Sequence, residues 1–530
     1  MKKFLVIQID GLSHDRLLDA CHKGYCPALS MLIKERHLHR YNCGLPSNTP
    51  FAQAGLMFGH NEHIPGFRFV DKKLRKQFSV NNPLKTRLIE LTYLSKYQGI
   101  LKDGRSIVNL FSGGADESRL TNSMLYQKDP KAFLAQFDIF LFLLYPRVLA
   151  AVASRGILHG ATYLQYLYEN FWNKVEHLAN PSDFKYNVTS FFSSVFFEEL
   201  ETKAMIKEMR KKTPYLYVTF NGYDECSHHQ GPSSPAAYEA LASIDKKMAR
   251  IFAQKQDYDI YILSDHGHTE SVPFRQLYGI GFKQFVRQEL GHYRHARDRY
   301  FRKKHQQADI VDQFFLKPLV NLEHAYHYLF SKSFKSLHQQ LHWNSHPYFL
   351  EVSDPMANLY FTFTDEKADM SEVERHYPGF LDTLRSHPGI GFVFGKEGDY
   401  VKVISRDGTA YIGTGDADHH FIGERFLRNY GDEFTLTRQL RYFGQMENSG
   451  DLIIFGDYSK GNVISFINHF GSHGSAGGEQ MHPFFLSPEK HDLSGVINSA
   501  QLHPLFMRYH LLNAQEAEQK KFYENAVVNS

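Results

Sequence analysis

The hydrophobic positions of this chain gather in short runs that stop abruptly at a polar residue. Phe4–Ile9 stops at Asp10, and a second run fills most of Tyr258–Ser264. Runs of this length predict buried strands, and the stretches between them have helical spacing. The pattern therefore predicts an α/β protein. Further strands are expected near Tyr215 and at Leu38–Tyr41, Asn358–Thr364, Tyr400–Ser405, Thr409–Ile412 and Asp451–Phe455, and helices at Ser13–Cys21, Ser233–Phe252, Met370–Ser386 and His503–Lys521.

The first two of these strands are followed by side chains that suit a metal ion. Asp10 comes directly after one strand, and Asp265 and His266 come directly after the other. Open α/β sheets bind ligands at the carboxyl ends of their strands. An oxygen donor beside an imidazole suits zinc or, in an oxygen-rich site, manganese. The alternative is structural, because an aspartate at a strand end often caps the next helix.

A polar turn at residues 46–50 leads into an apolar stretch that predicts a helix ending near Gly59. Thr49 would lie at or just before the N-terminus of this helix, where free N–H groups and the helix dipole favour phosphate. Its hydroxyl has two interpretations. It is either a helix cap or a nucleophile whose pKa is lowered by a metal ion.

Two further segments carry side chains that can bind a metal ion. Asp224 and His228 are four residues apart, so both can reach one ion from a turn or a short helix. His473 lies among glycines in Phe470–Gln480, where a flexible backbone allows close approach to another group. A polar loop and a flexible loop are the respective structural alternatives.

Basic residues offer weaker candidates for anion binding. Arg68 is a candidate phosphate contact because a guanidinium group matches phosphate oxygens, and a surface arginine is the alternative. Gln288–Gln307 is rich in Arg, Lys and His. Such a run is usually a solvated helix face, and otherwise it attracts an anionic substrate or a lipid surface.

The overall composition narrows the classes of partner. The chain has 530 residues, of which 42% are hydrophobic, and a net charge of +3 with histidine neutral. This near balance gives no reason to expect a nucleic-acid polymer as partner. Its four cysteines include no CxxC pair, so neither a thiolate zinc knuckle nor a disulfide framework is supported. Nothing in the pattern favours one oligomeric state.

The first residues predict a strand rather than a secretion signal, which makes a cytoplasmic protein the expectation. Phe133–Ala153 has nearly the length of a membrane span. Asp138, Pro146 and Arg147 interrupt it, so we expect a buried or interfacial helix pair instead. Peripheral contact with a membrane surface is the alternative.

Five segments are expected along the chain. Residues 1–81, 212–287 and 451–530 should form the catalytic core, the last with a C-terminal helix. Residues 82–211 carry long helical patterns and should form an insertion. Residues 288–450 should contain the basic helical segment and a smaller α+β cap module.

Several of these segments carry recognisable motifs, which occur in one order: IDG at Ile9–Gly11, PSNTPF at Pro46–Phe51, GYDECSHHQGP at Gly222–Pro232, SDHG at Ser264–Gly267 and GSHG at Gly471–Gly474. The ordered set resembles the type I phosphodiesterase/nucleotide pyrophosphatase family of the alkaline phosphatase superfamily. The resemblance implies a central, mostly parallel sheet with helices on both faces. It also implies a hydrolase that acts on a small phosphate ester.

The resemblance further implies two divalent cations, zinc in most members, with manganese as the alternative. It assigns one ion to Asp10, Asp265, His266 and the Thr49 oxygen, and the other to Asp224, His228 and His473. Thr49 then attacks phosphorus, and the phospho-threonine is hydrolysed. Where the family's nucleotide pyrophosphatases place an asparagine, this sequence offers Arg68, which weakens the expectation of a nucleotide substrate.

Other functions stay open at this point. A phosphomonoesterase or a phosphonate hydrolase of the same superfamily uses the same metals. A sulfatase needs a C/S-x-P-x-R pattern, which Ser47–Phe51 lacks. The alternative from another class is a non-catalytic membrane-surface or scaffold protein, although a scaffold has no reason to keep Thr49 together with a full ligand set.

Overall fold

The structure is a computed structural model that describes residues 1–125, 198–254, 257–291, 343, 346–414, 421–423 and 426–528. Phe133–Ala153 and most of Gln288–Gln307 lie outside this description. Within it, no helix combines the length and the apolar character needed to cross a membrane. The chain forms two compact units: Met1–Asn61, Ser79–Ser271 and His469–Ser530 make the first, and Glu62–Phe78 and Val272–Asn468 make the second.

The first unit is built on a sheet with the strand order β2-β20-β8-β1-β7-β5-β6. β1 lies at its centre and pairs in parallel with β7 and β8, and β5 and β6 continue the parallel arrangement. β20 alone runs antiparallel to its neighbours β8 and β2. The predicted α/β fold with a mostly parallel sheet is therefore confirmed. The strands are β1 (Phe4–Ile9), β2 (His37–Arg40), β5 (Arg105–Ile107), β6 (Glu117–Arg119), β7 (Tyr215–Phe220), β8 (Asp259–Leu263) and β20 (Phe484–Ser487).

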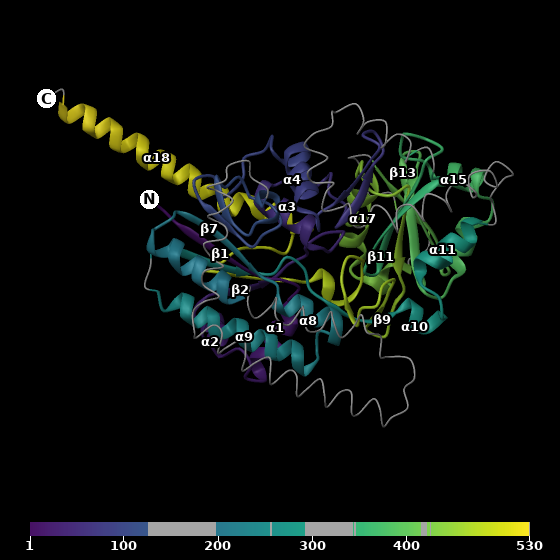
Figure 1. Cartoon of the computed structure of the whole chain (residues 1–530), viewed down its shortest axis with the longest axis horizontal. Coiled ribbons are helices and arrows are strands. Elements are labelled where there is room, and N and C mark those ends of the chain that lie inside the picture. Colours follow the sequence, from purple (N-terminus) through teal and green to yellow (C-terminus); the bar gives the residue numbers. More distant parts are fainter. Residues whose placement is uncertain are drawn as a thin grey trace, which may run out of the picture. The chain divides into compact units, whose positions relative to one another are not determined.

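Helices cover both faces of this sheet. The side chains of β1 alternate between the two faces, so each face offers apolar groups for a helix to pack against. Its odd-numbered residues join a core cluster with α1, α2 and α9. On the other face, the rings of Phe4 and Phe506 in α18 are 5.5 Å apart, and Gln53 of α3 donates a hydrogen bond to Gln8. Figure 1 shows α1, α2 and α9 on one side of β1 and β7, with α18 on the other. The helices are α1 (His14–His22), α2 (Pro27–Glu35), α3 (Thr49–Phe58), α4 (Pro83–Ile89), α8 (Gly222–Gln230), α9 (Pro235–Phe252) and α18 (His503–Val528).

The second unit has an antiparallel sheet with the order β10-β11-β16-β12-β13-β14-β15. Buried side chains of this sheet form one core with α10, α11, α15 and α16. The stretch Met370–Ser386, predicted as helical, forms two helices that are separated at Pro378-Gly379, because α15 ends at His376 and α16 begins at Phe380. The elements are α10 (Phe274–Tyr278), α11 (Phe282–Gly291), β10 (Tyr348–Ser353), β11 (Met356–Phe361), α15 (Met370–His376), α16 (Phe380–Ser386), β12 (Ile390–Glu397), β13 (Tyr400–Ser405), β14 (Gly408–Gly413), β15 (Phe421–Gly423), α17 (Glu433–Gln445) and β16 (Leu452–Gly456).

Candidate active site

The three central parallel strands of the first unit end at one edge, and each is followed by a candidate ligand. Asp10 follows β1, Asp265 follows β8, and Asp224 lies in α8, directly after β7. The cap of α1 is Ser13, whose hydroxyl accepts a hydrogen bond from the backbone N–H of Arg16. Asp10 is therefore not a helix cap, and Asp265 is followed by the strand β9 (Thr269–Pro273) rather than by a helix.

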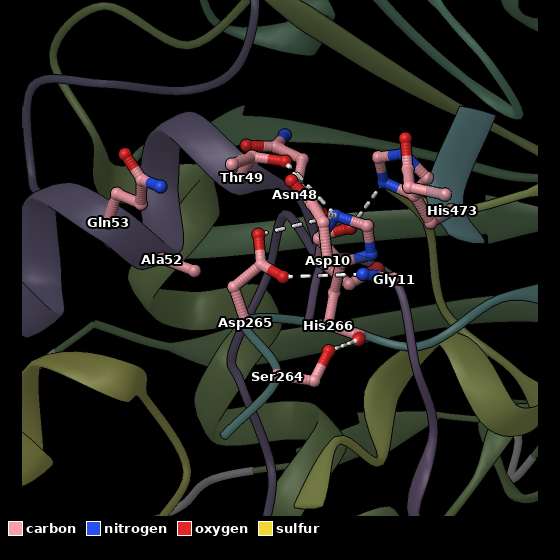
Figure 2. A network of polar contacts seen from close by, with 12 residues as sticks. Asp10, Gly11, Asn48, Thr49, Ala52, Gln53, Ser264, Asp265, His266 and His473 are labelled. Carbon is pink, nitrogen blue, oxygen red and sulfur yellow. Dashed lines mark hydrogen bonds and ion pairs between the residues drawn. The ribbon is translucent and has the colours of Figure 1, made fainter. Parts of the chain in front are cut away.

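Thr49 is the first residue of α3, and its hydroxyl faces the same edge of the sheet. The cap of α3 is Asn48, whose side-chain oxygen accepts a hydrogen bond from the N–H of Phe51 at 3.2 Å. The Thr49 Oγ1 instead lies 3.1 Å from His266 Nε2 and 3.5 Å from Asp10 Oδ1 (Figure 2). The structure thus assigns the capping role to the neighbour and leaves the Thr49 hydroxyl among the candidate ligands.

Asp10, Asp265 and His266 form one buried cluster around this hydroxyl. His266 Nε2 lies 3.3 Å from Asp10 Oδ1 and 3.5 Å from Asp265 Oδ2. Burial raises the pKa of both carboxyl groups well above the ordinary range, and the nearby Asp224 raises that of Asp10 further. Among the described residues, the buried Asp265 Oδ2 has no hydrogen-bond partner. A cation would satisfy this oxygen and relieve the repulsion between the carboxylates.

Asp224, His228 and His473 form a second cluster, and His268 lies within it. His228 Nε2 is 3.4 Å from Asp224 Oδ2 and 3.2 Å from His473 Nε2, and His268 Nε2 is 2.7 Å from Asp224 Oδ1. Burial alone would raise the pKa of Asp224, but the adjacent histidines His228 and His268 hold it well below its ordinary value. Burial lowers the pKa of His268 to about 4.

The two clusters meet, so that they make one site. The rings of His266 and His473 stack with their centroids 3.7 Å apart. One candidate ligand atom from each of Asp10, Asp224 and His266 lies within 4.8 Å of the others, and the same holds for Asp224, His228, His268 and His473.

Three of the histidines are oriented in the same way. Each has its Nδ1 within hydrogen-bond distance of a backbone carbonyl oxygen, so Nδ1–H donates and the Nε2 lone pair faces the site. The pairs are His228 with Gly471 at 2.9 Å, His266 with Gly267 at 3.0 Å and His473 with Ser47 at 3.0 Å.

Buried polar residues fix the loop that carries His473. The Ser47 hydroxyl accepts a hydrogen bond from the N–H of Gly474 at 3.0 Å. Gln480 donates from its side chain to the carbonyl of Gly477 at 2.8 Å, and its own carbonyl accepts from the N–H of Gly267 at 3.0 Å. These bonds tie the loop to the turn after β8, so both halves of the site are held by one network.

The structure brings together every residue in the predicted ligand set. Carboxylates, Nε2 lone pairs and a buried oxygen without a hydrogen-bond partner fit divalent cations that accept nitrogen and oxygen donors. Arg68 begins β3 (Arg68–Asp71) in the second unit, and its side chain is exposed. Its contact with phosphate stays a prediction. His268 is the site residue that sequence reasoning missed; the second histidine of His266-Gly267-His268 was the available signal.

The sheet and its donor set define the class: an α/β protein with a candidate metallohydrolase site. The model of the type I phosphodiesterase / nucleotide pyrophosphatase family matches residues 4–347, and the chain belongs to this family. It is therefore a phosphoester hydrolase, as the motifs predict. No curated protein matches the sequence.

Several solved structures are similar to this one. Murine ectonucleotide pyrophosphatase / phosphodiesterase 5 has 14% sequence identity and a TM-score of 0.47, with 97% of this chain and 95% of that chain covered. Phosphonoacetate hydrolase from Sinorhizobium meliloti has 14% identity and a TM-score of 0.49, with 95% of each chain covered. Wild-type alkaline phosphatase PafA has 11% identity and a TM-score of 0.48, with 92% and 91% covered.

Proposed function

We propose that this chain hydrolyses small phosphodiesters with Thr49 as the nucleophile. The observation that carries the proposal is the position of the Thr49 hydroxyl, 3.1 Å from His266 Nε2 at the start of α3. A hydroxyl placed among a full set of metal ligands, and released from capping by Asn48, fits a nucleophile better than a structural group.

The chain's own residues suggest where two divalent cations would bind. Asp10, Asp265 and His266 would hold one of them beside Thr49, and a second group would hold the other: Asp224, His228 and His473. The mixed nitrogen and oxygen donors favour zinc, with manganese as the alternative. When bound, such ions lower the pKa of an attacking oxygen and neutralise charge on a leaving oxygen.

The proposed reaction has two displacement steps. In the first, Thr49 Oγ1 forms a bond to phosphorus, and the bond from phosphorus to one ester oxygen breaks. The hydroxyl proton leaves to solvent, and the departing alkoxide takes up a proton. In the second, water attacks the phospho-threonine, the Oγ1–P bond breaks, and Thr49 recovers its proton. The sum is a diester and water giving a monoester and an alcohol.

Replacement of the Thr49 hydroxyl tests the proposal. Thr49→Ala should lower the turnover of bis-para-nitrophenyl phosphate by at least about a thousandfold, since the nucleophile is lost. Elemental analysis should still find zinc or manganese in this variant, because the carboxylate and imidazole donors remain. Thr49→Ser is the matched control, and it should keep measurable turnover because it keeps the hydroxyl.

Near-normal turnover in Thr49→Ala would remove Thr49 from this role. Wild-type protein that binds no metal and shows no activity after zinc or manganese is added would favour a scaffold instead. Rates on an aryl monoester, a nucleotide diester, a glycerophosphodiester and a phosphonate then define the substrate class. Faster turnover of the monoester or the phosphonate would overturn the preference for diesters.

A further inference from the structure

His268 lies directly before β9 and is buried with 2% of its surface exposed, beside the second cluster of ligands. Its Nε2 is 2.7 Å from Asp224 Oδ1, which is a hydrogen-bond distance. The other oxygen of that carboxylate, Oδ2, is 3.4 Å from His228 Nε2. His268 therefore contacts one oxygen of Asp224, while the opposite oxygen faces a ligand histidine.

The second ring nitrogen separates His268 from the other histidines of the site. His228, His266 and His473 each donate Nδ1–H to a backbone carbonyl, so that the Nε2 lone pair of each ring is directed into the site. The buried Nδ1 of His268 has no hydrogen-bond partner within the described parts of the chain. A neutral ring with a bare Nδ1 carries its proton on Nε2, where it can donate to Asp224.

The packing around His268 holds this arrangement in place. Its ring lies edge-to-face against the rings of Tyr223 and His228, with centroids 6.4 and 4.6 Å away. On the side of β1, a Cβ atom at Gly11 would come within 2.7 Å of both Asp224 Oδ1 and His268 Cδ2. Because residue 11 is glycine, Asp224 and His268 can occupy the space that a Cβ atom would take.

We propose that His268 is a positioning residue: its Nε2–H holds Oδ1 of Asp224, so that Oδ2 is directed at a cation bound with His228 and His473. The inference rests on the two-cation site of the proposed function and adds a residue outside that ligand set. It gives Asp224 the kind of hydrogen-bonded support that ligating carboxylates need in order to keep one orientation.

Two substitutions separate positioning from direct ligation. His268→Leu removes the donor, and His268→Gln keeps an N–H donor at a similar reach from the backbone. Zinc affinity, measured by competition with a chromogenic chelator, should fall about 10- to 100-fold in His268→Leu. In His268→Gln it should stay within about threefold of wild type, because the hydrogen bond to Asp224 is kept. Cobalt-substituted His268→Gln should keep the wild-type visible spectrum, since no ligand has changed.

Two results would overturn the inference. Wild-type zinc affinity in His268→Leu would show that the hydrogen bond has no role, and an equal loss in both variants with an altered cobalt spectrum would make His268 a ligand. Unfolding in the presence of chelator checks that each variant folds, and the cobalt spectrum of His268→Gln decides alone if His268→Leu does not fold. Failure of the two-cation site is a separate result, because wild-type protein would then bind no zinc.

Discussion

At the scale of single residues, the site depends on Gly11, which has no side chain that could bind a metal ion or react. Gly11 has a positive φ of 72°, a conformation that residues with a Cβ adopt only at a cost. The space where a Cβ would lie is filled by Asp224 and His268. Gly11 therefore lets the chain turn after β1 and lets α8 bring its carboxylate close to Asp10.

Gly11→Ala should weaken zinc binding, and Gly24→Ala is the matched control. Gly24 has a similar φ of 81°, but nothing lies within 4 Å of its Cβ position. Both variants should lose about 1 kcal/mol of unfolding free energy from backbone strain. Only Gly11→Ala should lose zinc affinity, by about tenfold or more, because it displaces Asp224 and His268. Chelator competition and denaturant unfolding measure the two effects, and equal zinc affinity in both variants would contradict the prediction.

The candidate ligand residues could be named from the sequence, whereas the contacts that support them could not. Asp10 and Asp265 could be predicted because each follows an apolar run, and strand ends are where such sheets bind ligands. His268 could not be assigned a role in this way. Its contact with Asp224 depends on how the turn after β8 packs against α8, and no local pattern records that packing.

At the scale of elements, α3 is the helix that carries the proposed nucleophile, Thr49, in its first turn. Asn48 accepts a hydrogen bond from the N–H of Phe51, which fixes the direction in which the chain enters the helix. Thr49 is the next residue, so the cap also sets where its hydroxyl points. α4 begins in a similar way, with Asn82 accepting from the N–H of Lys85, but it carries none of the predicted site residues.

Asn48→Ala and Asn82→Ala form a matched pair of cap deletions. Each should cost about 1 kcal/mol of unfolding free energy, the usual value for loss of an N-cap. Asn48→Ala should in addition lower kcat on an aryl phosphodiester by about tenfold or more, because misplacement of a reacting group slows the chemical step. Asn82→Ala should leave kcat unchanged. Equal kcat values in the two variants would show that the cap does not position Thr49.

The positions of strands and helices were predicted more reliably than the pairing of the strands. The run Asp451–Phe455 was correctly predicted as a strand, β16, and it pairs with β11 and β12 in the second sheet. A buried strand is apolar on both faces whichever sheet it joins, so its sequence does not indicate which strands it pairs with. Likewise β5 and β6, inside the segment expected to be a helical insertion, are short strands of the first sheet.

At the scale of the whole molecule, the second unit contains a partly buried lysine, Lys367, whose titration should make the stability of this unit depend on pH. The Lys367 ammonium group donates to the carbonyl oxygens of Gly444 and Met446, at 2.7 and 3.2 Å. Burial lowers the pKa of Lys367 from 10.5 to about 7. Between these two values the unfolded chain keeps the proton that the folded chain releases, so stability should rise with pH.

The difference in unfolding free energy between wild type and Lys367→Met isolates this effect. It should grow in favour of wild type by up to about 1.4 kcal/mol per pH unit as the pH rises through this window. Lys402→Met, on β13, is a control for the replacement of a lysine by methionine elsewhere in the second unit. Denaturant unfolding at a series of pH values measures both. A Lys367→Met difference that does not change with pH would contradict the lowered pKa.

The order of strands in the first sheet also bears on how the protein is made. Asp10 is synthesised long before His473 and β20. β20 lies between β2 and β8, so the nascent chain cannot complete this sheet until β20 has left the exit tunnel. A nascent chain that stops before His473 therefore lacks part of the candidate site, which can form only after this segment has been made.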